Sequence, residues 1–117
     1  MTDLAVDEAD YGDVAVLALR GELDLATVPA LRDRLLEVVR THRSVVLDLS
    51  GLGFLDSTGL GLLVSAVKRL HARKGSLVVT APSPTVRRLL EVSGLVGHLA
   101  IRESPEKALE VLAAENG

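Results

Sequence analysis

Two hydroxyl groups, a carboxylate and a glycine stand side by side at Asp56, Ser57, Thr58 and Gly59. An apolar, strand-like run precedes them and a helical apolar pattern follows, so they fall where a helix begins. The first N–H groups of a helix lack intrahelical partners, and a side-chain oxygen of Asp56 or Ser57 could cap them. A cap does not require a second hydroxyl, however. Gly59 and Gly61 also leave little side-chain bulk, so another molecule could approach the hydroxyls closely.

The flanking sequence predicts the elements that position this segment. Residues 45–49 form a nearly unbroken apolar run, typical of a strand buried on both faces. Residues 50–53 contain a serine and two glycines and predict a loop, after which Phe54 and Leu55 return to apolar surface. The helix that follows should bury a stripe made of Leu60, Leu63, Val64, Val67 and Leu70.

The common catalytic patterns are missing from this region. Ser57 lacks the Gly-x-Ser-x-Gly elbow of a hydrolase, and the neighbouring glycines are not followed by the lysine of a phosphate-binding loop. Asp48 could pair with Asp56, but we expect Asp48 to end its strand facing solvent or to cap the loop. Three histidines have no partner at metal-ligand spacing: His42, His71 and His98. We therefore expect no enzyme, cofactor or metal site.

Three stretches resemble the motifs of the STAS-domain anti-anti-sigma factors, the bacterial anti-sigma factor antagonists. They read GELDLAT at 21–27, DLSGLGFLDSTGLGLL at 48–63 and SPTVRRLLEVSGL at 83–95, in the order found in that family. The resemblance covers nearly the whole chain, so it implies a single STAS domain over residues 1–117.

The resemblance also implies a function. Ser57 would be phosphorylated by an anti-sigma factor that is a serine/threonine kinase, and a phosphatase would remove the phosphate. Thr58 is the second candidate, because it is β-branched and nearer the helix interior. The unphosphorylated protein would bind the kinase and release a sigma factor, and phosphorylation would end binding. The expected binding surface consists of Glu22, Asp24, Asp56, Ser57, Thr58, Gly59 and Leu60.

Two alternatives remain open at the level of sequence. Without the resemblance, Glu22 and Asp24 are most simply solvated loop acids. The whole chain could also be a STAS scaffold that assembles into a larger signalling complex without switching. Transfer of phosphate to Ser57 by a cognate kinase separates this scaffold from the switched antagonist.

Composition limits the class of protein. The chain has 117 residues, of which 48% are hydrophobic and only Tyr11 and Phe54 are aromatic, so one domain with an aliphatic core is expected. A net charge of −3 without a basic patch argues against nucleic-acid binding. No apolar run approaches the ~20 residues of a membrane span, and the acidic N-terminus lacks the features of a signal peptide. We expect a cytoplasmic protein that is a monomer when free.

The rest of the chain predicts alternating strands and helices. An initial hairpin joins strands at 4–6 and 14–19 through a turn at Asp10, Gly12 and Asp13. A loop at 21–24 leads to a helix capped by Thr27, and the helix after Ser57 should end with Gly75 as its C-cap. Strands at 77–80 and 99–102 alternate with helices at 83–94 and from 104 onward. The expected fold is α/β, in the order β-β-α-β-α-β-α-β-α, with a mixed sheet covered by about four helices.

Overall fold

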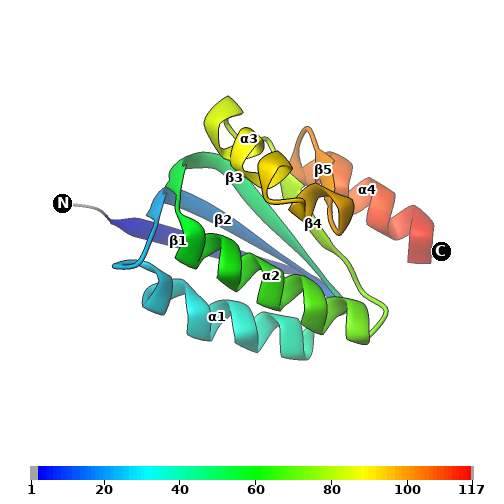
Figure 1. Cartoon of the computed structure of the whole chain (residues 1–117). Helices are drawn as coiled ribbons and strands as arrows, with labels where there is room; N and C mark the ends of the chain where they lie inside the picture. Colours follow the sequence, from blue (N-terminus) through cyan, green and yellow to red (C-terminus); the bar gives the residue numbers. More distant parts are fainter. Residues whose placement is uncertain (1–2, 117) are drawn as a thin grey trace.

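A five-stranded sheet carries four α-helices in the computed structural model, which describes residues 3–116 (Figure 1). The predicted order of strands and helices is confirmed, with one added 3-10 turn, η1. In chain order the elements are β1 (Leu4–Tyr11), β2 (Val14–Leu23), α1 (Val28–Thr41), β3 (Ser44–Leu55), α2 (Ser57–Ala72), β4 (Leu77–Thr80), α3 (Pro84–Val92), η1 (Leu95–Gly97), β5 (Ala100–Arg102) and α4 (Pro105–Asn116).

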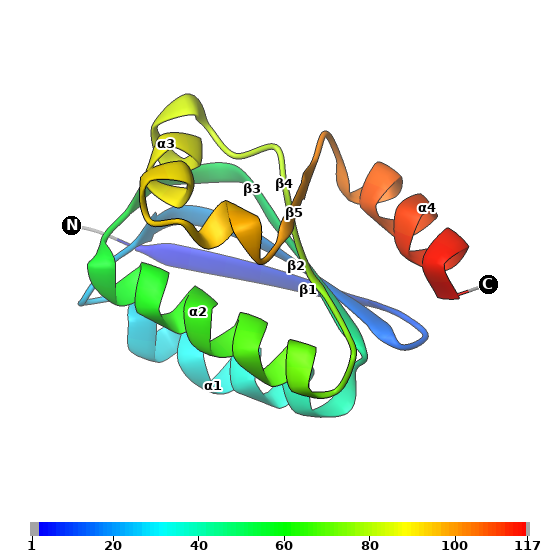
Figure 2. The same ribbon diagram turned by 45° about the vertical axis from the view of Figure 1, so that its right-hand side comes forward.

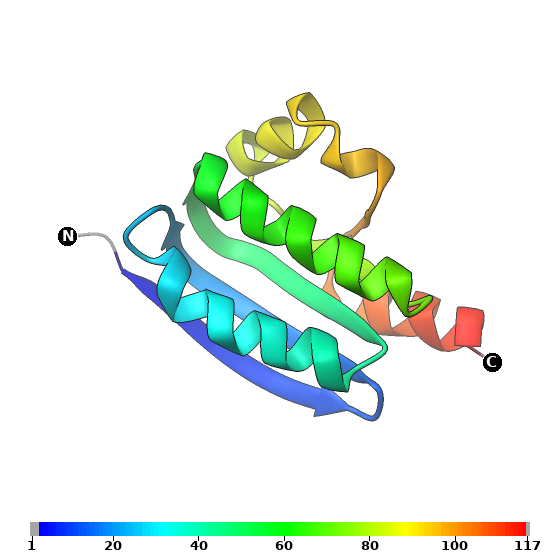
Figure 3. The ribbon, with the colours of Figure 1, turned by 60° about the horizontal axis from the view of Figure 1, so that its bottom comes forward.

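The strands lie in the order β1-β2-β3-β4-β5. The predicted hairpin pairs β1 and β2 antiparallel, and the other neighbours are parallel, so the sheet is mixed as expected. Helices α1 and α2 lie side by side on one face together with α3, whereas α4 covers part of the other face (Figures 2 and 3). Among residues 3–116, no helix combines the length and apolar character needed to cross a lipid bilayer.

Strand β3 is the central strand and is buried on both faces at its start. Val45 and Leu47 belong to the core under α1 and α2, while Val46 packs in the smaller core under α4. This alternation follows from the two-residue repeat of a strand. Both cores are aliphatic, because the two aromatic side chains are exposed: Tyr11 by 55% and Phe54 by 44%. The aliphatic core is thus confirmed, but the expected return of Phe54 to apolar surface is wrong.

Three strands are longer than predicted. Strand β1 runs to Tyr11, so the turn comprises only residues 12–13. Strand β2 continues to Leu23, through all but the last residue of the loop predicted at 21–24, and β3 continues through the loop predicted at 50–53. The two extensions pair with each other, with Arg20 opposite Gly51 and Leu23 opposite Leu55, across two register shifts. A Cβ at Gly51 would lie 2.6 Å from Cγ of Arg20. The glycine therefore marks a close approach of strands rather than a loop.

Gly75 is not the residue that ends α2. The C-cap is Arg73, and Lys74 takes the left-handed conformation with φ of 62°. The N–H of Gly75 donates to the carbonyl of Leu70 and that of Lys74 to the carbonyl of His71, which is a Schellman motif. A Cβ at Gly75 would lie 1.6 Å from the carbonyl oxygen of Arg43. Gly75 is therefore required by this chain crossing, one position beyond the left-handed residue.

Candidate functional site

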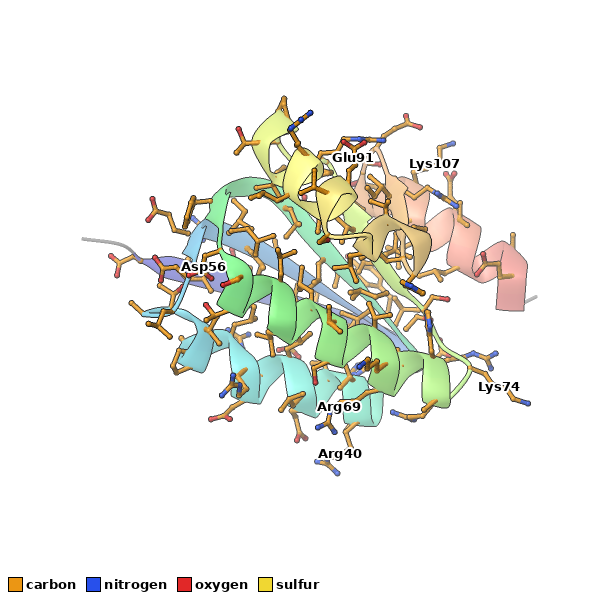
Figure 4. All side chains as sticks on the ribbon, viewed as in Figure 1. Arg40, Asp56, Arg69, Lys74, Glu91 and Lys107 are labelled. Carbon is orange, nitrogen blue, oxygen red and sulfur yellow. The ribbon has the colours of Figure 1, made fainter. Side chains whose placement is uncertain are left out.

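The predicted site residues meet at the carboxyl ends of β2 and β3, where α2 begins (Figure 4, at Asp56). Parallel strands end at the same edge of a sheet, so the β2–α1 loop and the first turn of α2 become neighbours. Two hydrogen bonds join them directly. The N–H of Leu25 donates to Oδ2 of Asp56 at 3.0 Å, and the N–H of Asp56 donates to the carbonyl of Leu23 at 3.1 Å.

Asp56 is the N-cap of α2. Its Oδ1 accepts from the N–H groups of Thr58 and Gly59, each at 3.0 Å, and from the hydroxyl of Thr58. The bond from the Thr58 hydroxyl is the main cause that lowers the pKa of Asp56 below its ordinary value of 3.8, with the backbone bonds adding to it against partial desolvation. Asp56 is therefore a carboxylate at neutral pH, and the cap is Asp56 rather than Ser57.

The two hydroxyls differ in their surroundings. Ser57 is the first residue of α2 and its side chain is exposed, whereas Thr58 is half-buried and its hydroxyl donates to Asp56. Gly61 lies one helical turn beyond Ser57 on the same face. It is exposed, and a Cβ there would meet no heavy atom within 4 Å. Another molecule can thus approach the Ser57 hydroxyl over Gly61.

Gly59, which was also expected at the binding surface, does not provide this access. The residue is buried, and a Cβ there would lie 2.6 Å from Cδ1 of Leu55 and 2.9 Å from Cγ of Leu23. Gly59 therefore lets α2 pack closely against the ends of β2 and β3. Leu60, the other expected surface residue on this turn, is half-buried and packs against the core.

The β2–α1 loop is held by its own side chains. Oδ1 of Asp24 accepts from the N–H groups of Ala26 at 3.0 Å and Thr27 at 3.1 Å. The hydroxyl of Thr27 donates to the carbonyl of Glu22 at 2.8 Å and accepts from the N–H of Asp24 at 2.9 Å. Thr27 occupies the predicted N-cap position but makes no side-chain cap bond. Asp24 is therefore more than a solvated loop acid, because its carboxylate shapes the loop.

Glu22 lies in a strand instead of the predicted loop. It is half-buried at the end of β2 and stands opposite Phe54 of β3. The next pair, Leu23 and Leu55, is buried under the helices. Because neighbouring strand positions alternate between faces, Glu22 and Phe54 belong to the opposite face of the sheet.

One exposed apolar residue beside the site was missed by the sequence analysis. The side chain of Leu25 is 73% exposed, although its backbone is fixed to Asp56. Its exposure could have been predicted from its position between Asp24 and Thr27, two residues typical of turns and helix caps. A solvated loop at such a position favours a polar side chain, so a leucine there is unusual.

The site is acidic and apolar. Residues 21–31 and 50–67 include Glu22, Asp24 and Asp56 but contain no lysine, arginine or histidine. Within residues 3–116, no group of three or more histidine or acidic side chains is arranged to hold a metal ion. The chemistry available at this surface is therefore an accessible hydroxyl, fixed negative charge and exposed apolar area.

Comparison with known proteins gives consistent matches. The STAS domain family matches residues 6–108. An anti-sigma F factor antagonist of Paenibacillus polymyxa is 31% identical over 112 residues, which cover 94% of this chain and 96% of the relative. The crystal structure of an anti-sigma factor antagonist from Mycobacterium paratuberculosis has a TM-score of 0.85 and 29% identity over 95% of both chains. The Bacillus cell fate determinant SpoIIAA in its phosphorylated form has a TM-score of 0.74 and 27% identity, covering 91% of this chain and 97% of that one.

The two glycines of α2 give a matched pair of substitutions. Gly61→Ala should raise the free energy of unfolding by about 0.5–1 kcal/mol, because alanine is the better helix former and the added methyl group meets open space. Gly59→Ala should lower it by about 1 kcal/mol or more, since crowding against Leu23 and Leu55 outweighs the same gain in propensity. Urea unfolding of both variants measures this, and a stabilised Gly59→Ala would contradict the packing role.

The contribution of the Asp56 cap to folding stability should depend on pH in the acid range. Its pKa is lowered in the folded state, so its contribution to stability is complete above pH ~4 and is lost as the pH falls through the lowered value. Asp56→Ala should therefore melt a few degrees below the wild type near neutral pH, and the gap should close in strong acid. Thermal melts of both proteins between pH 7 and 2 measure the gap. A gap that does not change with pH would show that the charge of Asp56 does not stabilise the fold.

Proposed function

Because the chain belongs to the STAS-domain family, we propose that it is an anti-sigma factor antagonist switched by phosphorylation of Ser57. The unphosphorylated protein binds an anti-sigma factor that is a serine/threonine kinase, and a sigma factor is released. Phosphorylation of Ser57 ends this binding, and a phosphatase restores it. In this proposal the protein acts in the cytoplasm and is a monomer when free. The names of the relatives support antagonism, and the phosphorylated form of one structural neighbour supports the switch.

The choice of Ser57 as the phosphorylation site rests on the different exposure and hydrogen bonding of the Ser57 and Thr58 hydroxyls. The Ser57 side chain is exposed at the first position of α2, with open space over Gly61. The Thr58 hydroxyl is half-buried and donates to Asp56, so a kinase would have to break this hydrogen bond to use it. A hydroxyl that another protein modifies must be reachable, and Ser57 meets this requirement better.

The switch follows from where the phosphate would lie. It adds about −1.5 to −2 charges next to the ionised Asp56. The helix dipole favours an anion at this end, but two of the N–H groups that could bind it already donate to Asp56. The phosphate would therefore remain largely hydrated. Removing water from it in a complex costs several kcal/mol, and ~1.4 kcal/mol is a tenfold loss of affinity.

We predict that incubation with the cognate kinase and ATP adds one phosphate, and that fragmentation by mass spectrometry places it on Ser57. Ser57→Ala should bind the kinase without being modified. Ser57→Asp should fold but bind at least tenfold more weakly, because it brings charge to the contact. Calorimetry with wild type, phosphoprotein and both variants measures the affinities.

Two results of this experiment would count against the proposal. Phosphate on Thr58 with Ser57 unmodified would overturn the choice of residue. Equal affinity of the kinase for wild type and phosphoprotein would overturn the switch, and would favour the scaffold that assembles without switching.

Asp24 gives a second prediction, because two substitutions can separate the effect of its charge on binding from the effect of its hydrogen bonds on the loop. Asp24→Asn keeps an oxygen for the N–H groups of Ala26 and Thr27 but removes the charge. Its melting temperature should stay within a few degrees of the wild type while kinase binding weakens several-fold. Asp24→Ala should lose both binding and about 1 kcal/mol of stability, because the loop bonds disappear. Unchanged binding by Asp24→Asn would show that its charge does not contact the partner.

A further inference from the structure

Leu25 has the most exposed large hydrophobic side chain in residues 3–116, at 73%. It lies in the β2–α1 loop, and its N–H donates to Asp56, the residue before Ser57 (Figure 4, at Asp56). Single exposed leucines are common and need no explanation by themselves. Leu25 differs because of how it is held and what surrounds it.

The turn that carries Leu25 is fixed on both sides. Before it, Asp24 accepts from the N–H groups of Ala26 and Thr27, and the carbonyl of Asp24 accepts from the N–H of Val28 at 2.8 Å. The Leu25 N–H is fixed across the loop by Asp56, 31 residues away in sequence. The side chain is therefore presented from an ordered backbone. Binding through such a residue loses little conformational entropy.

The surroundings indicate what kind of surface fits Leu25. Two acids adjoin Leu25: Asp24 precedes it in the chain, and Asp56 accepts its N–H. Residues 21–31 and 50–67, which contain both acids, carry no basic residue. A complementary surface therefore has an apolar pocket for the leucine and basic side chains at its border. Phe54 is exposed at the same end of the sheet and stands opposite Glu22, but both residues belong to the opposite face, so neither is part of this combination.

We propose that Leu25 is an apolar anchor of the docking surface, and that it inserts into an apolar pocket of the anti-sigma factor bordered by lysine or arginine side chains. The inference rests on the proposed function and adds the residue that supplies the apolar contact. Asp56 acts as a positioning residue for this anchor. A phosphate on Ser57 would lie next to the backbone link that holds Leu25, so seating the leucine would require dehydrating the phosphate.

The test compares Leu25→Ser with Tyr11→Ser. Tyr11 is another exposed hydrophobic residue, 55% exposed, but it stands opposite Val14 at the far end of β2. The partner is the kinase that phosphorylates Ser57 in the experiment above, and calorimetry and surface plasmon resonance measure binding. Leu25→Ser should bind tenfold or more weakly through faster dissociation, with an unchanged melting temperature. Leu25→Met should restore wild-type affinity within about threefold, and Tyr11→Ser should bind like the wild type.

The outcomes separate the anchor from the proposed function. If the wild type neither binds the kinase nor is phosphorylated, the proposed function fails. If the wild type binds and is phosphorylated while Leu25→Ser binds within twofold of it, the anchor is overturned and the function stands. Equal losses in Leu25→Ser and Tyr11→Ser would also overturn the anchor. An association rate that does not fall with added salt would overturn the basic border of the pocket.

Discussion

The carboxylate of Asp56 joins the two segments from which the site is built. One oxygen accepts from the first turn of α2 and the other from the backbone of Leu25 in the β2–α1 loop. The same carboxylate also takes the hydroxyl of Thr58, which turns that side chain inward and leaves the neighbouring Ser57 at the surface. A single, partly buried carboxylate thus fixes the helix start, the loop and the choice between two adjacent hydroxyls.

Close packing of α2 against the ends of β2 and β3 holds this carboxylate in position. Asp56 can reach the loop only if α2 starts directly above the ends of β2 and β3, and Gly59 permits that distance because any side chain there would collide with Leu23 and Leu55. The bulged pairing of the strand ends brings the same two leucines under the helix. The exposed surface is therefore set by the geometry of the buried layer, as expected in tightly packed interiors.

The sequence was sufficient for features that depend on local pattern. The order of elements, the aliphatic core and the helix start at Asp56 follow from periodicity and capping. Three of the errors share one physical cause, because a glycine in a sequence indicates either a turn or a close approach and does not distinguish them. Gly51, Gly59 and Gly75 each face a distant segment, at Arg20, Leu23 and Arg43, which only the folded chain reveals. The extended pairing of β2 with β3 was likewise out of reach of local pattern.

The charge of this surface also limits how a phosphate could act on binding. The site already carries Asp24 and the ionised Asp56 before any modification, so a phosphate would strengthen an existing negative field and would not reverse it. A partner with basic groups would still be attracted from a distance. A phosphate would therefore have to act at close contact, where its water would be removed beside Leu25 and where two of the helix N–H groups already donate to Asp56. Dehydration at contact, and not long-range repulsion, is the physical basis on which such a surface can switch.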